Sequence, residues 1–450
     1  MTDQRLLHGQ WSSRLAFILA ASGSAIGLGN IWKFPYLLGE NGGGAFVLVY
    51  LACVVGIGLP IMMAETMLGR RGRQSPINTM AALAEEAGVH RAWRYVGWLG
   101  VAAGFLILSY YSVIAGWSMA YIFKMGGGFL NNVTPQMAQQ TFQDIKAAPD
   151  VQLVWHTAFM AATVLIVSKG VSQGLERVTR LMMPGLFLML LALDIYAAGT
   201  SGFSQGMSFL FKPEFSKLTG ESLLVAMGQA FFSLGLGMGS IMVYGSYLPD
   251  HVSIGRSSIF VATADTLVAL MAGVAIFPVV FSNQLAPGMG PGLIFESLPL
   301  AFGHMPGGSL FGTLFFILVF FAAITSAIAL IEPAVAWLSE NRSLSRVRAS
   351  IYAGFACWFL GLGTLISFSH GASVTWFGKT LFELVDFITA DLMLPAGGIL
   401  IAVFAGWIVK KQESAQELEL GSYFCYWRIL IRYVAPLSVF IIFAHAMGLL

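Results

Sequence analysis

The chain has 450 residues, of which 57% are hydrophobic and only 10% are charged, and its mean hydropathy is +0.77. Soluble domains carry about 25% charged residues, so this composition excludes a soluble globular protein and indicates a polytopic membrane protein. The net charge of +2 is no indication of nucleic-acid binding. The three cysteines lie in or beside apolar segments, which does not suggest a disulfide framework or a metal cluster.

Apolar segments of about 20 residues, the length that crosses a bilayer, recur eleven times along the chain. They lie at 13–38, 42–68, 95–123, 151–168, 179–199, 222–247, 255–282, 307–338, 349–368, 381–408 and 428–449. The first segment is too long for the core of a cleaved signal peptide, so we interpret it as a retained span. The sequence therefore predicts an all-α membrane protein with eleven transmembrane helices.

The first and sixth segments contain glycine clusters, at Ser22 to Asn30 and at Ser233 to Gly239. Glycine is a weak helix former, and open backbone at membrane depth persists only where it faces protein, ions or a wet cavity. We therefore expect interrupted helices whose freed carbonyls can bind a small cation. Either cluster alone fits an ordinary small-residue helix contact. Paired interruptions in matching halves instead indicate a transporter site near the bilayer midplane.

The spans divide into two halves of similar length. Spans one to five occupy 13–199, spans six to ten occupy 222–408, and each half opens with an interrupted helix. Because five is an odd number, the second half begins on the opposite side of the membrane, which predicts an inverted repeat. We expect one transporter domain over residues 1–450, with an additional transmembrane helix at 428–449.

Lys and Arg residues gather on one side of the predicted topology. If the N-terminus is cytoplasmic, most of the 24 basic residues fall on the cytoplasmic side, including clusters at 70–73, 342–348 and 410–411. Cytoplasmic loops carry an excess of Lys and Arg. We therefore expect a cytoplasmic N-terminus and, with eleven spans, a C-terminus outside the cell.

Neither an enzyme nor a channel is indicated. The seven histidines are scattered without the spacing of a metal site, and Gly27-Leu28-Gly29 lies in an apolar span rather than after a strand. A channel would need a continuous polar stripe, whereas these spans hold isolated polar positions. No nucleic-acid partner and no obligate protein partner are predicted.

Several motifs resemble the neurotransmitter:sodium symporter family, whose members have the LeuT-type fold. They are Trp11-Ser12-Ser13-Arg14, Gly23 to Asn30, Phe34-Pro35-Tyr36, Asn41 to Phe46, Gly58-Leu59-Pro60, Gly69-Arg70, Tyr110-Tyr111, Gly228 to Ser233 and Ala322 to Ser326. The resemblance covers all ten core spans and is closest to bacterial members with eleven spans. It implies a 5+5 inverted repeat with broken helices 1 and 6. It also implies a sodium-coupled amino acid symporter of the bacterial inner membrane that works by alternating access.

The resemblance implies two sodium sites. The first would use the Ala25 carbonyl, the Asn30 side chain, Ser233 and Asp265. The second would use the carbonyls of Gly23, Ile26 and Ala322 with the hydroxyls of Thr325 and Ser326. Hydroxyl and carbonyl oxygens are the ligands that hard cations take. The alternative for Thr325 and Ser326 is ordinary hydrogen bonding to the preceding helical turn.

Asp265 is a carboxylate within the seventh span. Such residues are costly in a membrane and functional by default. Relatives that need chloride typically carry Asn at this position, so the resemblance implies chloride independence, with Asp265 balancing the sodium charge. We hypothesise that Asp265 is ionised beside sodium and takes up a proton when the site empties. The alternative is a plain hydrogen bond between helices.

The resemblance also implies an amino acid substrate. Amine-transporting relatives carry an Asp where this chain has Gly27, which leaves the backbone of Ala25, Gly27 and Gly29 free to receive a carboxylate. Tyr111 matches the tyrosine that hydrogen-bonds that carboxylate. The side-chain pocket would be lined by Ile107, Phe232, Ser233, Gly235, Met238, Ser326 and Leu330. This lining favours neutral, hydrophobic amino acids. The alternatives are another small zwitterion or osmolyte, or a sodium- and ligand-binding sensor without transport.

Gate positions follow from the same resemblance. The outer Arg–Asp pair of the family corresponds here to Lys33 and Asp386. Because Lys cannot form a planar bidentate bridge, we expect a looser or water-mediated contact, with Gln229 beside Lys33. Phe232 and Tyr111 would cap the ligand beneath this gate.

On the inner side, the matching gate positions are Trp11, Tyr247 and Glu340. The family's N-terminal Arg partner of Glu340 is replaced by His8, so Arg5 or Arg14 would have to substitute for it. Glu65, in the second span, is expected to accept hydrogen bonds from amides exposed by the break in span six.

Overall fold

The computed structural model describes residues 9–285, 292–369, 371 and 373–447. Within these residues the protein is helical, with two isolated bridges in place of any strand. Nine of the described helices are long and apolar enough to cross a membrane. A tenth span consists of α1 (Arg14–Ala25) and the bent continuation that ends in α2 (Phe34–Glu40). The protein is therefore all-α and membrane-spanning, as the sequence predicts.

The spanning elements follow the predicted segments. After α1 and α2 they are α3 (Gly44–Cys53), α4 (Leu59–Gly72), α6 (Arg94–Gly126), α8 (Pro149–Ser168), α9 (Arg177–Ala198), α13 (Ile254–Ser282), α15 (Gly308–Asn341), α16 (Arg346–Phe368), α17 (Leu381–Asp386), α18 (Leu394–Val403), α20 (Phe424–Ile429) and α21 (Ala435–Ala446). Shorter connecting helices are α5 (Pro76–Glu86), α7 (Pro135–Ala147), α10 (Phe203–Phe211), α14 (Leu298–Gly303) and α19 (Lys411–Leu418).

Both predicted interruptions are present. The two halves of the first span meet at an angle of 51°. In the sixth span, α11 (Gly220–Ser233) and α12 (Ser240–Ser246) are separated by non-helical backbone. Gly235, Gly237 and Gly239 in this gap have φ angles of 65°, 78° and 72°. Only glycine adopts such backbone readily, so the glycine cluster is what allows the helix to open.

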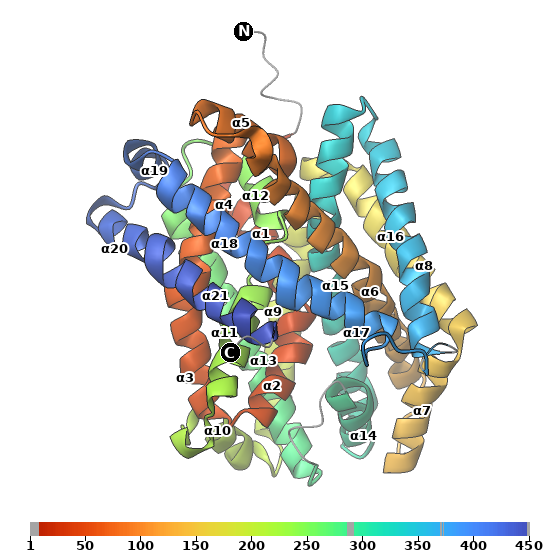
Figure 1. The fold of residues 1–450 in the computed structure, drawn as a ribbon. Coiled ribbons are helices and arrows are strands. Elements are labelled where there is room, and N and C mark those ends of the chain that lie inside the picture. The colour runs from red at the N-terminus through yellow and green to blue at the C-terminus, as the bar shows by residue number, and fades with distance from the viewer. Residues whose placement is uncertain (1–8, 286–291, 370, 372, 448–450) are drawn as a thin grey trace.

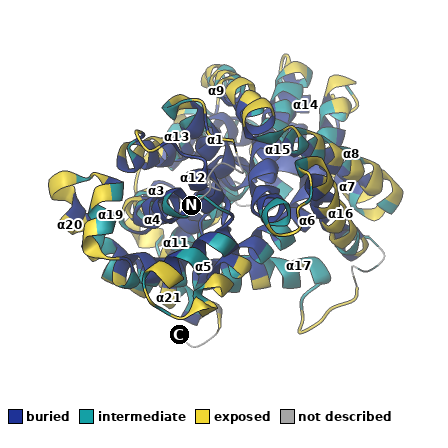
Figure 2. Ribbon diagram, turned by 90° about the horizontal axis from the view of Figure 1, so that it is seen from above, coloured by how far each residue is buried: buried dark blue, intermediate teal, exposed yellow. Residues whose placement is uncertain are grey.

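The interrupted spans lie at the centre of the helix bundle (Figure 1). Seen from above, α1, α12 and α15 are buried, whereas α8, α9 and α16 carry exposed residues on the perimeter (Figure 2). Many of those exposed residues are large and apolar, such as Leu188 on α9 and Phe355 and Phe359 on α16. Apolar side chains on the outside of such a bundle are suited to contact with lipid.

α4 and α12 pack backbone against backbone. A Cβ added to Gly69 would overlap the Met242 carbonyl oxygen, and one added to Gly245 would lie 2.6 Å from the Thr66 carbonyl oxygen. Small residues at helix contacts in membranes allow this close approach. The second span is therefore joined tightly to the inner half of the sixth.

Candidate functional site

Three polar side chains from three different elements meet where the interrupted spans face each other. Asn30 Nδ2 donates to Ser233 Oγ at 3.1 Å and to Asp265 Oδ1 at 2.8 Å. Ser233 Oγ donates to Asp265 Oδ2 at 2.7 Å. None of the three is more than 2% exposed. The three side chains of the first predicted cation site thus form one buried cluster that contains a carboxylate.

Tyr50, on α3, completes this cluster, although it was not among the residues predicted from the sequence. Its hydroxyl lies 3.3 Å from both Ser233 Oγ and Asp265 Oδ2. A buried tyrosine hydroxyl usually finds a polar partner. The presence of Tyr50 in an apolar span was therefore a usable signal, but it did not say which partner the hydroxyl would reach.

A second cluster joins the end of α1 to α15. Ser326 Oγ lies 3.2 Å from the Ser24 carbonyl, 3.3 Å from the Gly23 carbonyl and 3.4 Å from the Ile26 carbonyl. Thr325 Oγ1 lies 3.0 Å from the Ala322 carbonyl on its own helix, which is the back-bonding expected as the alternative. Of the five predicted oxygen ligands of the second site, the structure therefore joins Ser326 to Gly23 and Ile26 across the two helices, while Thr325 and Ala322 bond to each other within α15.

A small cavity of about 30 Å³ shares Ser326 with the second cluster. It is lined by Ser24, Ala25, Gly27, Leu28, Gly29, Ile107, Tyr111, Phe232, Gly235, Met238, Ser240, Ser326 and Leu330. All the predicted pocket residues are here except Ser233, which lies in the first cluster. Ser24, Leu28 and Ser240 were not predicted, although the first two fall within the interrupted stretch itself. The volume is about that of one water molecule in the liquid.

At the first break, the Leu28 amide is directed at the polar end of this cavity, whereas the Gly27 amide donates to Asn30 Oδ1 at 3.2 Å. The Leu28 amide donates to the Tyr111 hydroxyl at 3.4 Å. A Cβ at position 27 would lie 2.6 Å from Ser326 Oγ and 3.1 Å from the Tyr111 hydroxyl, so a larger residue would fill this space. Gly27 therefore keeps the Leu28 amide within reach of a small anionic group.

Two buried side chains stabilise the opened backbone. Glu65 Oε1 accepts a hydrogen bond from the Gly237 amide at 2.7 Å, which is the contact expected from the sequence. Gln229 Nε2 donates to the Gly29 carbonyl at 2.9 Å, rather than contacting Lys33 as expected. Opened backbone at membrane depth needs such partners. Each of these contacts reaches across from one span to the break in another.

A larger cavity of about 310 Å³, which we call the vestibule, adjoins the pocket and shares Tyr111 and Phe232 with it. Lys33 and Asp386 both line the vestibule. The Lys33 Nζ lies 4.5 Å from the centroid of the Phe232 ring, and Asp386 Oδ1 accepts a hydrogen bond from the Tyr110 hydroxyl at 2.9 Å. Among the described residues, Lys33 forms no ion pair, so the predicted outer-gate residues lie in one cavity without a direct bond.

On the opposite side of the bundle, Trp11 is fastened to the inner half of span six. Its backbone amide donates to the Tyr247 carbonyl at 3.1 Å, and its indole Nε1 donates to the Tyr244 carbonyl at 3.0 Å. The Tyr247 hydroxyl donates to Glu332 Oε1 at 2.6 Å, and the Arg346 guanidinium contacts Glu332 Oε2 at 2.5 Å. Glu332 was not predicted to have a role. Its position as a carboxylate within an apolar span could have indicated that it has a buried polar partner.

Glu340, at the end of α15, accepts hydrogen bonds from the Ser75 amide and the Asn78 side chain, both at 2.7 Å. It therefore ties α15 to the start of α5. Of the two basic residues expected to substitute as its partner, Arg5 lies outside the described residues, as does His8 at the position of the family's Arg. The Arg14 guanidinium packs over the Phe260 ring at 5.2 Å.

Comparison with known proteins agrees with this geometry. The model of the "Sodium:neurotransmitter symporter family" matches residues 8–141 and 129–448. The chain is 40% identical to YhdH, an uncharacterized sodium-dependent transporter of Bacillus subtilis (strain 168), over 100% of both chains. It is 31% identical to an uncharacterized sodium-dependent transporter of Haemophilus influenzae, over 98% of this chain and 99% of the relative.

The same fold is found in the crystal structure of MhsT in complex with L-phenylalanine. The TM-score is 0.90 at 41% sequence identity, over 98% of this chain and 100% of that chain. The fold is thus that of a LeuT-type transporter, and the family consists of transporters rather than enzymes. The chain is therefore a multi-pass, sodium-dependent symporter of a small molecule and belongs to the sodium:neurotransmitter symporter family.

Proposed function

We propose that the protein imports neutral, hydrophobic amino acids together with sodium ions by alternating access, without chloride. The observation that supports this most is the placement of an apolar pocket beside two buried clusters of oxygen atoms, at the meeting point of two interrupted spans. Broken helices at the membrane midplane are where such carriers hold ion and substrate together. The proposal includes a cytoplasmic N-terminus, an external C-terminus and the bacterial inner membrane, in line with the Lys and Arg distribution.

Two sodium ions are proposed. The first would be held by the Ala25 carbonyl and by the side chains of Asn30, Ser233 and Asp265. These three side chains already meet in one cluster. The second would be held by the carbonyls of Gly23, Ile26 and Ala322 with the hydroxyls of Thr325 and Ser326. Both sets consist of oxygen atoms, as a hard cation requires. In the second set, rotation of the Thr325 hydroxyl away from its own helix would free it for the ion.

The substrate carboxylate would take the place of the Tyr111 hydroxyl at the Leu28 amide and accept a hydrogen bond from that hydroxyl. Its side chain would lie among Ile107, Met238 and Leu330, and none of the described residues that line this cavity is charged. MhsT, which shares this fold, binds L-phenylalanine in its crystal structure, and that ligand agrees with a pocket for apolar side chains.

Asp265 would supply the negative charge that balances sodium in the first site. When the ion leaves, the isolated carboxylate would take up a proton, because an uncompensated charge at membrane depth is costly. Return of the empty carrier would then carry that proton outward. The proposal therefore predicts both chloride independence and a response to pH.

Ligand binding and transport can be tested together. We expect L-phenylalanine and L-leucine to raise the melting temperature of the purified protein in sodium but not in potassium. Binding at 100 times Kd stabilises a folded protein by about 2.7 kcal/mol. L-lysine, L-glutamate and glycine betaine serve as controls and are expected to have no effect. A sodium gradient should then drive uptake of the stabilising amino acids into proteoliposomes.

Stabilisation by betaine or by a charged amino acid would contradict the proposed substrate class. Sodium-dependent stabilisation without gradient-driven uptake would instead show a binding sensor rather than a carrier.

Ser326→Ala is expected to weaken sodium binding at least tenfold, because it removes a ligand that reaches the opened end of α1. A hydrogen bond or ligand contact to a charged group contributes about 1.5–3 kcal/mol. The measurement is the sodium concentration that gives half-maximal thermal stabilisation. Ser350→Ala is the matched control, since Ser350 is also buried but bonds only to its own helix. Equal sodium responses in the two variants would argue against a sodium site at Ser326.

A further inference from the structure

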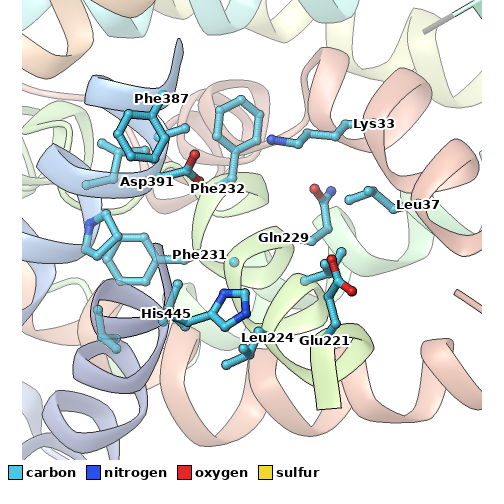
Figure 3. Close-up of a pocket in the computed structure, with 17 residues that line it drawn as sticks. Lys33, Leu37, Glu221, Leu224, Gln229, Phe231, Phe232, Phe387, Asp391 and His445 are labelled. Carbon is cyan, nitrogen blue, oxygen red and sulfur yellow. The ribbon is translucent and has the colours of Figure 1, made fainter. Parts of the chain in front are cut away.

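A second cavity of about 300 Å³ lies beside the vestibule, and Lys33 and Phe232 line both. We call it the lateral cavity. Its walls come from α11, the π-helical segment Phe387–Met393, α18 and α21. Figure 3 shows the Lys33 side chain extending toward the Phe232 ring, with the Asp391 carboxylate on the other side of that ring in this view. Phe232 therefore stands at the junction of the pocket, the vestibule and the lateral cavity.

Asp391 differs from Asp386 in its surroundings. Asp386 accepts the Tyr110 hydroxyl at 2.9 Å, so that carboxylate already has a donor. Among the residues that the structure describes, no side chain or amide donates a hydrogen bond to Asp391, although it belongs to the spanning segment Leu381–Ile408. The Lys33 side chain lines the same cavity as Asp391. Asp391 is exposed to the lateral cavity, so its carboxylate is accessible to a cation that enters that cavity.

Lys33 is suited to move between two partners. Its ammonium is a point charge with three donors on a flexible stem, unlike the planar fork of Arg. In the structure it lies 4.5 Å from the Phe232 ring centroid, a cation–π position. That position is between the vestibule, which contains Asp386, and the lateral cavity, which contains Asp391.

We propose that Asp391 is a second docking position for the Lys33 ammonium. This inference rests on the proposed carrier function and adds a positioning residue to its outer gate. When Lys33 contacts Asp386, its side chain extends across the vestibule and closes it. When Lys33 contacts Asp391, its side chain turns into the lateral cavity and leaves the vestibule open. The two carboxylates therefore compete for one cation, and removal of either one favours the other.

Because the two carboxylates compete, neutralising Asp391 and neutralising Asp386 should change the accessibility of the vestibule in opposite directions. Asp391→Asn favours the Lys33–Asp386 contact and should close the vestibule, whereas Asp386→Asn should open it. The reporter is Ile114→Cys, because Ile114 lines the vestibule. The background carries Cys425→Ser, which removes the exposed native cysteine and keeps the buried Cys53 and Cys357. An uncharged maleimide labels the reporter, so that the lost carboxylate does not alter the rate by attracting the reagent.

Labelling is measured on the full-length protein without substrate. We expect Asp391→Asn to slow labelling and Asp386→Asn to accelerate it, each about threefold to fivefold. This is the change in an equilibrium that the loss of one partly exposed ion pair produces. Asp391→Glu keeps the charge and should retain the parent rate. Asp391→Ser is a second neutral variant with the same expected effect as Asp391→Asn.

Glu221→Gln is the matched control, because Glu221 lines the same lateral cavity but lies away from Phe232 in Figure 3. The proposal is overturned if Asp391→Asn leaves the rate unchanged, if it changes the rate in the same direction as Asp386→Asn, or if Glu221→Gln has an equal effect. Sodium-dependent thermal stabilisation by amino acids is measured on the same samples. If the parent protein lacks that response, the carrier function is refuted. The labelling rates still test whether Asp386 and Asp391 compete for Lys33.

Discussion

Asp265→Asn is expected to lower the sodium affinity about a hundredfold in chloride-free buffer and to make uptake depend on chloride. The carboxylate is fully buried and lies within hydrogen-bond distance of Asn30 and Ser233. A unit charge about 5 Å from sodium, at an effective dielectric constant of about 20, contributes roughly 3 kcal/mol. Asn has a similar shape and can still form hydrogen bonds, but it is neutral. A halide ion therefore has to supply the missing negative charge.

The measurement is sodium-driven uptake into proteoliposomes with chloride or gluconate as the anion, at several values of internal pH. Asp194→Asn serves as a matched control, because Asp194 is another acidic residue in a spanning helix but lies outside both clusters. If Asp265→Asn transports equally well in gluconate and keeps the pH dependence of the parent, Asp265 neither balances sodium nor carries a proton.

Glu332→Ala is expected to weaken strongly the contacts that join α15 to Tyr247 and Arg346. Glu332 is fully buried and receives both the Tyr247 hydroxyl and the Arg346 guanidinium. Removal of one member of a buried ion pair typically costs about 3–5 kcal/mol, because the remaining charge stays unpaired. The melting temperature should therefore fall, and a cysteine reporter on the inner side of α12 should become more accessible.

A double-mutant cycle separates this pair from a general loss of packing. Arg346→Ala combined with Glu332→Ala should recover part of the stability lost in either single variant, because the double variant leaves no unpaired charge. Glu332→Gln keeps an acceptor for Tyr247 and should give an intermediate result. Strict additivity of the two alanine substitutions would show that the ion pair contributes little.

The spans and their interruptions were predictable from the sequence because both depend on local properties. A run of apolar residues long enough to cross the bilayer is visible in the chain itself. The positive φ angles of Gly235, Gly237 and Gly239 likewise depend on residue type, with glycine at three alternate positions. The clustering of Asn30 with Asp265 was accessible only through resemblance to a family, since the two residues lie on different spans.

What the sequence could not supply is the partner of each polar side chain. Gln229 was expected beside Lys33, but it donates to the Gly29 carbonyl. Tyr50 and Arg346 reach their partners because of how their helices are rotated in the bundle. Helix rotation is determined by packing against several neighbours at once, and the hydrophobic pattern of a helix that is apolar on all sides does not encode it.

The contact between Gly69 on α4 and the Met242 carbonyl on α12 has a consequence for how transport can be measured. Because the two backbones approach this closely at two points, we expect α4 and α12 to move together as one unit. Bending must then occur at the glycines between α11 and α12. Spin labels placed on α4 and α12 should keep a constant separation throughout the cycle. The distance between these two labels would serve as a constant internal reference for measuring the displacement of the other helices.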